Sequence, residues 1–147
     1  MRTTLIVVVL LFTTSLAAFA GKDERLQELI ARAEAARPQD QPGLYTEIAE
    51  RQVASADKLY ADGKVEDASA AVTDVVTYAD KARDAAVKTG KRLKQTEISM
   101  RKMAAKLRDV KRSLAFDDQG PVQTAVEHLE NLRTELQARM FGDKGKK

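Results

Sequence analysis

The segment 88–112 holds ten lysine and arginine side chains and only two acidic ones, Glu97 and Asp109. The chain on either side is slightly acidic, with a net charge of −5 over residues 22–87 and −1 over residues 113–147. Such an uneven distribution attracts anionic ligands to one part of a molecule. A run of charge can equally be the solvated face of a helix. The segment is therefore interpreted either as a binding surface or as the solvent-exposed face of a helix.

The apolar residues of this segment follow a heptad pattern with Leu93 at position a, which indicates which charges face solvent. Arg92, Lys106 and Lys111 flank the apolar seam. The other seven basic residues are expected to point away from a partner helix. These candidate anion-binding or partner-binding residues are Lys88, Lys91, Lys94, Arg101, Lys102, Arg108 and Arg112. Because Glu127 and Glu130 of the last predicted helix are also expected to face outward, the seven charges should remain unneutralised.

A ligand of this surface would be anionic. The segment 88–112 contains no aromatic residue and the chain contains no tryptophan, so the base-stacking platforms of nucleic-acid binders are missing. Nucleic acid is accordingly disfavoured. Anionic lipid headgroups, acidic envelope polymers and acidic protein surfaces fit better. The acidic half of a second copy is a further candidate, which would produce self-association.

No other residues form a constellation with recognisable chemistry. His128 is the single histidine, and its acidic neighbours lack the Glu-x-x-His spacing of a carboxylate-bridged metal site. We interpret it as a surface residue that flanks a helix interface. The chain has no cysteine, which excludes disulfides and thiolate chemistry, and no serine lies in a glycine-rich elbow. We therefore expect no metal, no cofactor and no enzymatic activity.

The first twenty residues have the pattern of a secretory signal peptide. Arg2 provides a basic start, residues 5–12 are apolar, and small residues surround Ala20, where cleavage is expected. Cleavage leaves one domain over residues 21–141 and a flexible basic tail at 142–147. The alternative is an uncleaved membrane anchor, although the apolar run falls short of the ~20 residues that a spanning helix needs. No later segment is apolar enough to span a bilayer, and the absence of cysteine favours a bacterial-type periplasmic or extracellular location.

Prolines and glycines divide the rest of the chain into segments with helical periodicity. We predict an all-α fold of antiparallel helical hairpins with a long central helix. The predicted helices cover residues 23–37, 43–62, 64–115 and 121–141. Apolar and small residues recur in steps of three and four from Val65 to Leu114 without a slip, which favours one continuous helix through Gly90. The alternative is a break at Gly90 that folds the two halves into a compact bundle.

The last helix is expected to pair with the end of the long one. The turn before Pro121 is short, which predicts that the last helix packs antiparallel to residues 93–114. Its apolar residues keep the same three-four rhythm, so coiled-coil packing is expected for this hairpin. These residues are Val122, Ala125, Leu129, Leu132 and Leu136.

Residues 52–82 resemble a single tetratricopeptide unit. The positions that carry the resemblance are Ala56, Leu59, Tyr60, Gly63 and Ala68. The positions that depart from the pattern are Gln52, Ser55, Val75 and Asp80. The resemblance covers this one hairpin and implies protein or peptide binding.

The sequence thus predicts an exported, non-enzymatic helical scaffold or protein-interaction protein. The alternative function is that of an envelope-associated protein, which docks on anionic lipid or polymer through the basic face of residues 88–112.

Overall fold

The computed structural model describes the backbone of residues 16–142 and the side chains of residues 25–142. This range contains five α-helices, one short 3-10 helix and no strand, which confirms the predicted all-α fold. The helices are α1 (Leu16–Ala35), α2 (Gln41–Ala61), α3 (Val65–Thr89), α4 (Leu93–Arg112) and α5 (Gln119–Phe141), and the 3-10 helix η2 (Phe116–Asp118) precedes α5. The predicted signal peptide and basic tail lie mostly outside the described residues.

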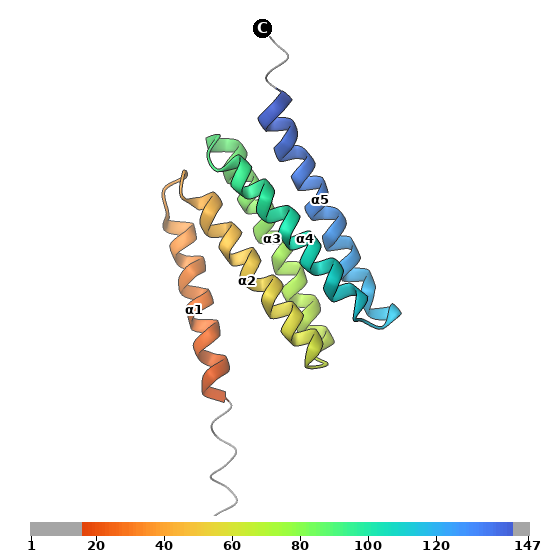
Figure 1. Ribbon diagram of the computed structural model, residues 1–147. Helices are drawn as coiled ribbons and strands as arrows, with labels where there is room; N and C mark the ends of the chain where they lie inside the picture. Colours follow the sequence, from red (N-terminus) through yellow and green to blue (C-terminus); the bar gives the residue numbers. More distant parts are fainter. Residues whose placement is uncertain (1–15, 143–147) are drawn as a thin grey trace, which may run out of the picture.

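Helices α2 and α3 form one antiparallel hairpin, and α4 and α5 form a second (Figure 1). The hairpins stack so that α2 lies against α4 and α3 lies against α5, which makes a four-helix bundle. Helix α1 packs along the outer side of α2. The α1–α2 and α3–α4 connections lie at one end of the bundle, and the α2–α3 and α4–α5 connections lie at the other.

The predicted continuous helix over residues 64–115 is wrong, and the alternative with a break at Gly90 is correct. Helix α3 ends at Thr89 and α4 begins at Leu93. Between them Gly90 (φ +67°) and Arg92 (φ +58°) both have left-handed backbone conformations, which a right-handed helix cannot contain. Gly90 ends α3 as a left-handed C-terminal residue, a position that glycine favours because it has no Cβ. The chain then reverses its direction.

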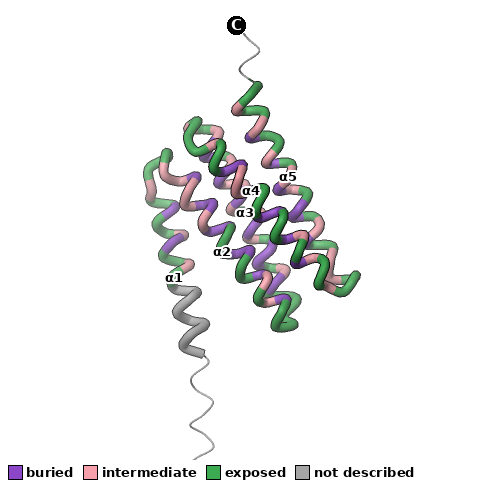
Figure 2. The backbone as a smooth tube through the Cα atoms, in the orientation of Figure 1, coloured by how far each residue is buried: buried purple, intermediate pink, exposed green. Residues whose placement is uncertain are grey.

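The apolar seam was nevertheless predicted in the correct register. Most of its positions are buried, on both helices: Ala68, Val72, Val75, Ala79, Ala82, Ala86, Thr96, Met100, Met103, Leu107 and Val110. The positions at the helix ends, Val65, Thr89, Leu93 and Leu114, are more exposed. Figure 2 shows that the buried sides of α3 and α4 face the same core. The three-four spacing of buried residues therefore continues from α3 into α4, although a turn separates the two helices.

Both ends of α2 have the backbone geometry that their glycine and proline residues favour. Gly63 (φ +74°) closes α2, with its own N–H donating to the Tyr60 carbonyl at 3.0 Å and the Lys64 N–H donating to the Leu59 carbonyl at 2.9 Å. These are the two bonds of a Schellman motif. Pro42 lies in the first turn of α2, where its missing N–H would have had no helical partner. Helix α1 begins at Leu16 rather than at residue 23.

Helix α3 supplies the small side chains of the core. Its buried side consists of Ala68, Ala71, Val72, Val75, Ala79, Ala82, Ala85 and Ala86. Larger residues from the other helices fill the space beside them, and several of these are fully buried: Ile48, Met100, Leu107, Leu129, Leu132 and Leu136. Alanine on one helix and longer side chains on its neighbours allow close packing without voids.

The α3–α4 turn permits a direct stability test with Gly90→Ala. In a continuous helix this substitution would raise the free energy of unfolding by about 1 kcal/mol, because alanine has the higher helix propensity. With a left-handed backbone at residue 90, we expect the substitution to lower the free energy of unfolding by roughly 1 kcal/mol or more. Urea denaturation of both proteins measures the sign, and a stabilised variant would contradict the turn.

Arg92→Gly is the matched variant for the second left-handed residue. Glycine removes the steric penalty of a Cβ in this conformation, so the free energy of unfolding should rise by up to ~1 kcal/mol. The same urea series measures it. A clear loss of stability would show that side-chain contacts of Arg92 outweigh the backbone strain.

Candidate anion-binding surface

The seven predicted basic residues lie on two helices and the turn between them. Lys88 is in the last turn of α3, Lys91 is in the α3–α4 turn, and Lys94 is in the first turn of α4. Arg92 lies between the last two. These four residues, Lys88, Lys91, Arg92 and Lys94, are called the basic tip below. Arg101 and Lys102 follow about two helical turns further along α4.

Two of the seven residues are engaged, which corrects the prediction for Arg108 and Arg112. Arg108 Nη2 donates to Glu130 Oε1 of α5 at 2.7 Å, and Arg112 Nη1 donates to Asp109 Oδ1 at 2.9 Å. Glu130 does not face outward as predicted. On the antiparallel α5 it lies opposite Arg108, and it also accepts a hydrogen bond from Arg133 Nη1 at 3.2 Å.

The other five residues remain exposed. Within residues 25–142, none of them forms an ion pair or donates a side-chain hydrogen bond: Lys88, Lys91, Lys94, Arg101 and Lys102. The predicted surface is therefore smaller than expected. It consists of the last turn of α3, the α3–α4 turn and the first half of α4.

The basic tip surrounds the N-terminal end of α4, where the helix dipole carries partial positive charge. The first turn of α4 contains no acidic residue, although acidic side chains are the ones that stabilise this position. The first carboxylate along α4 is Glu97, which is bonded to Arg133 of α5. Lys91, Arg92 and Lys94 therefore oppose the dipole, and the fold itself does not benefit from their charge.

Glu97 fixes α5 relative to the basic tip. The residue is only 7 % exposed. Its Oε1 atom accepts hydrogen bonds from Arg133 Nε at 2.7 Å and from Gln137 Nε2 at 3.1 Å. A buried carboxylate requires such partners, because burial without them is strongly unfavourable. The bonds set the register between α4 and α5 and thereby the position of the C-terminal end of α5.

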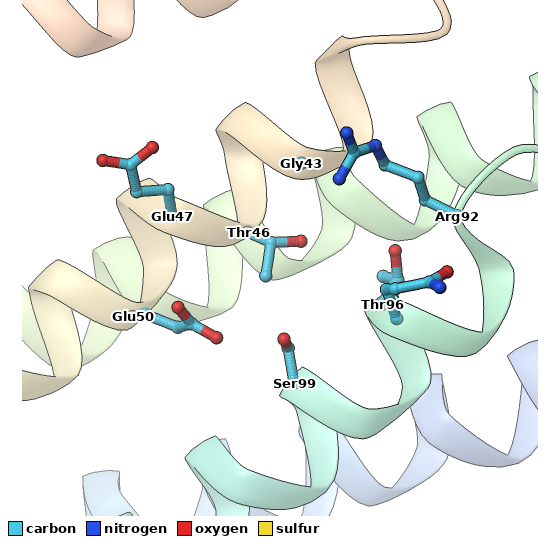
Figure 3. Close-up of a pocket in the computed structure, with 8 residues that line it drawn as sticks. Gly43, Thr46, Glu47, Glu50, Arg92, Thr96 and Ser99 are labelled. Atoms are coloured by element: carbon cyan, nitrogen blue, oxygen red, sulfur yellow. The ribbon is translucent and has the colours of Figure 1, made fainter.

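A shallow hollow of about 150 Å³ opens beside the basic tip, between α2 and α4 (Figure 3). It is lined by Gly43, Thr46, Glu47 and Glu50 of α2 and by Arg92, Gln95, Thr96 and Ser99. Arg92 lies over Gly43, where a Cβ would come within 3.2 Å of the guanidinium Nη1. The left-handed backbone of Arg92 aims this side chain at α2. Nothing in the sequence indicates a left-handed backbone at Arg92, so this hollow was not predicted.

A second hollow, of about 370 Å³, lies between α1 and α2. Its lining residues are Arg25, Glu28, Leu29, Arg32 and Arg51. Arg51 is engaged by Glu47 at 2.7 Å, and Glu28 places a carboxylate among the arginines. This hollow has mixed charge, as has the first hollow, which Arg92 lines together with Glu47 and Glu50.

His128 lies at the edge of the α3–α5 interface, as predicted. Its Nε2 atom is 2.8 Å from Asp80 Oδ1 of α3. Arg83 of α3 extends this polar edge through ion pairs with Asp84, at 2.8 Å, and with Glu135 of α5. Across the described side chains, no group of three or more histidine or acidic residues is arranged to hold a metal ion.

Comparison with known proteins found no matching family model, no matching curated protein and no matching solved structure. Among residues 16–142, none of the helices combines the length and the apolar character that crossing a bilayer requires.

Glu130 makes the α4–α5 interface sensitive to acid. Burial alone would raise the pKa of its carboxyl, but hydrogen bonds from Arg108 and Arg133 outweigh burial and hold the pKa below the ordinary value of 4.5. A carboxyl with a lowered pKa in the folded state adds stability above its unfolded pKa. That contribution is lost as the pH falls through the folded pKa.

We therefore expect Glu130→Gln to lower the thermal midpoint at neutral pH and to have a much smaller effect in strong acid, where the wild-type carboxyl is also neutral. Thermal denaturation over a pH series measures the difference. Glu127→Gln is the matched control, because it removes the same charge from an exposed position on α5 that does not contact Arg108 or Arg133. An equal loss at both pH extremes would contradict the assigned role of Glu130.

Proposed function

We propose that this chain is an exported, non-enzymatic helical interaction protein that docks an anionic partner. The docking surface is the basic tip together with Arg101 and Lys102. The observation that carries the proposal is the crowding of unpaired cations at the α3–α4 turn, where Lys91, Arg92 and Lys94 oppose the dipole of α4. Departures from locally favourable chemistry concentrate at functional sites.

The bundle suits a docking role because its rigid parts hold the surface in place. Lys106 Nζ of α4 pairs with Asp57 Oδ2 of α2 at 2.7 Å, and Arg108 pairs with Glu130 of α5. Helix α4 is thus tied to a neighbour on each side, and its outer face is left to solvent. Export rests on the pattern of the first twenty residues alone.

The proposal is tested with the triple variant Lys88→Glu, Lys94→Glu, Arg101→Glu. The wild type should bind soluble polyphosphate and anionic lipid vesicles at low salt, and binding should weaken as salt screens the charges. The triple variant should bind at least about tenfold more weakly, because attraction becomes repulsion. Cosedimentation and equilibrium titration over a salt series measure both effects.

The matched control is Arg25→Glu, Arg32→Glu, Lys58→Glu, which changes the net charge equally at exposed positions outside the surface. It should retain most of the binding. Failure of the wild type to bind any anionic probe at low salt would refute the proposed function, as would equal losses in both triple variants.

Lys94→Glu separates binding from folding. An acidic residue in the first turn of α4 complements the dipole, so the free energy of unfolding should rise by about 0.5 kcal/mol while anion binding falls. Urea denaturation and the titration above measure the two quantities on one protein. Lower stability combined with unchanged binding would contradict the role assigned to this position.

A further inference from the structure

Phe141 is an exposed aromatic residue at the same end of the bundle as the basic tip. It is the last residue of α5 and is 62 % exposed. Gln137 donates to Glu97 across the antiparallel α4–α5 pair. One helical turn beyond Gln137 is Phe141, and one turn before Glu97 is Leu93. Phe141 therefore lies level with the start of α4, and Figure 1 shows the end of α5 at the same end of the bundle as the α3–α4 turn.

Among the described side chains at this end, the four cations of the basic tip outnumber the one unengaged carboxylate, Glu50, which lines the hollow beside Arg92. Asp40, which precedes α2, pairs with Arg37 at 2.9 Å, and Glu97 pairs with Arg133 at 2.7 Å.

An apolar side chain beside a group of cations fits one class of anionic partner better than the others. A soluble polyanion or the acidic surface of a protein can pair with the lysines. Neither provides an apolar environment for the exposed ring of Phe141. The surface of an anionic bilayer offers both, since phosphates attract the cations and the headgroup–acyl boundary accepts an aromatic ring. Attraction of the cations and insertion of one ring are each weak membrane-binding signals, and stable attachment to a membrane commonly requires two such signals.

We propose that this end of the bundle docks on the surface of an anionic lipid bilayer, with Phe141 inserted at the headgroup level and the basic tip on the lipid phosphates. This inference rests on the proposed function and deepens it by naming the partner. The contact is peripheral, so that the helices remain outside the hydrocarbon core.

The native chain has no tryptophan, so Phe141→Trp introduces a single tryptophan at the proposed contact, whose emission can be excited selectively. Mixing this variant with vesicles of phosphatidylglycerol and phosphatidylcholine in equal parts should shift its emission to shorter wavelength. Lipids with brominated acyl chains should quench it. Phosphatidylcholine vesicles alone should produce neither effect. The matched control is Phe116→Trp, which replaces an 87 % exposed ring at the opposite end of the bundle and should show no change.

A second variant, Phe141→Ala, separates the bilayer from a soluble polyanion. It should reduce binding to the phosphatidylglycerol vesicles at least about fivefold, since an apolar contact is lost, and should leave polyphosphate binding unchanged. Equal vesicle binding by Phe141→Ala and the wild type would overturn the bilayer proposal, as would an emission shift of equal size in both tryptophan variants.

The outcomes also distinguish this inference from the proposed function. If polyphosphate binds in a manner that depends on the basic tip, but vesicles leave the Phe141→Trp emission unchanged, the inference fails and the proposed function stands. If no anionic probe binds, both fail. An emission shift that appears without vesicles and grows with protein concentration would show that a second copy covers Phe141, which also overturns the bilayer proposal.

Discussion

Left-handed backbone at Gly90 and Arg92 reverses the chain between α3 and α4, and the packing of the two hairpins into one bundle depends on that reversal. It brings α4 against α2, where Lys106 meets Asp57, and it places the α4–α5 hairpin on the α2–α3 hairpin. It also gathers lysines that are several residues apart in sequence around one helix N-terminus. A continuous helix would have spread the same charges along a single exposed rod.

The parts of the fold that depend on side-chain periodicity could be predicted from the sequence. Burial of Val75, Met100 and Leu107 follows from the three-four spacing, as does the antiparallel pairing of α4 and α5. The helix break could not be predicted in this way. Two helices that share a core can continue one hydrophobic phase across a turn, so an unbroken pattern does not demonstrate an unbroken helix. Only Gly90 indicated the break, and a single interior glycine is a weak signal.

Only part of the candidate surface was predicted, because the heptad pattern reports the position of a residue on its helix and not the contacts of its side chain. Heptad positions correctly identified Lys88, Lys91, Lys94, Arg101 and Lys102 as solvent-facing. They did not reveal the pairing of Arg108 with Glu130, because long side chains reach across a helix interface from positions that point partly outward. The pairing of Arg112 with Asp109 is local, at a spacing of three residues, and was readable from the sequence. What remains after these pairings is a group of unpaired cations, of which Lys91 and Lys94 oppose the dipole at the N-terminus of α4. That opposition is a burden on stability and a reason to assign the surface a function.

The central claim, that α4 folds back on the bundle, can be measured directly by pulsed electron spin resonance between two spin labels. The chain has no native cysteine, so Glu66→Cys near the start of α3 and Arg112→Cys at the end of α4 provide unique attachment sites at exposed positions. Both positions lie at one end of the bundle, and helix spacings of 8–10 Å together with the label arms predict a distance distribution centred at roughly 25 Å. A distribution centred near ~69 Å, the length of a continuous helix between these residues at 1.5 Å per residue, would contradict the account.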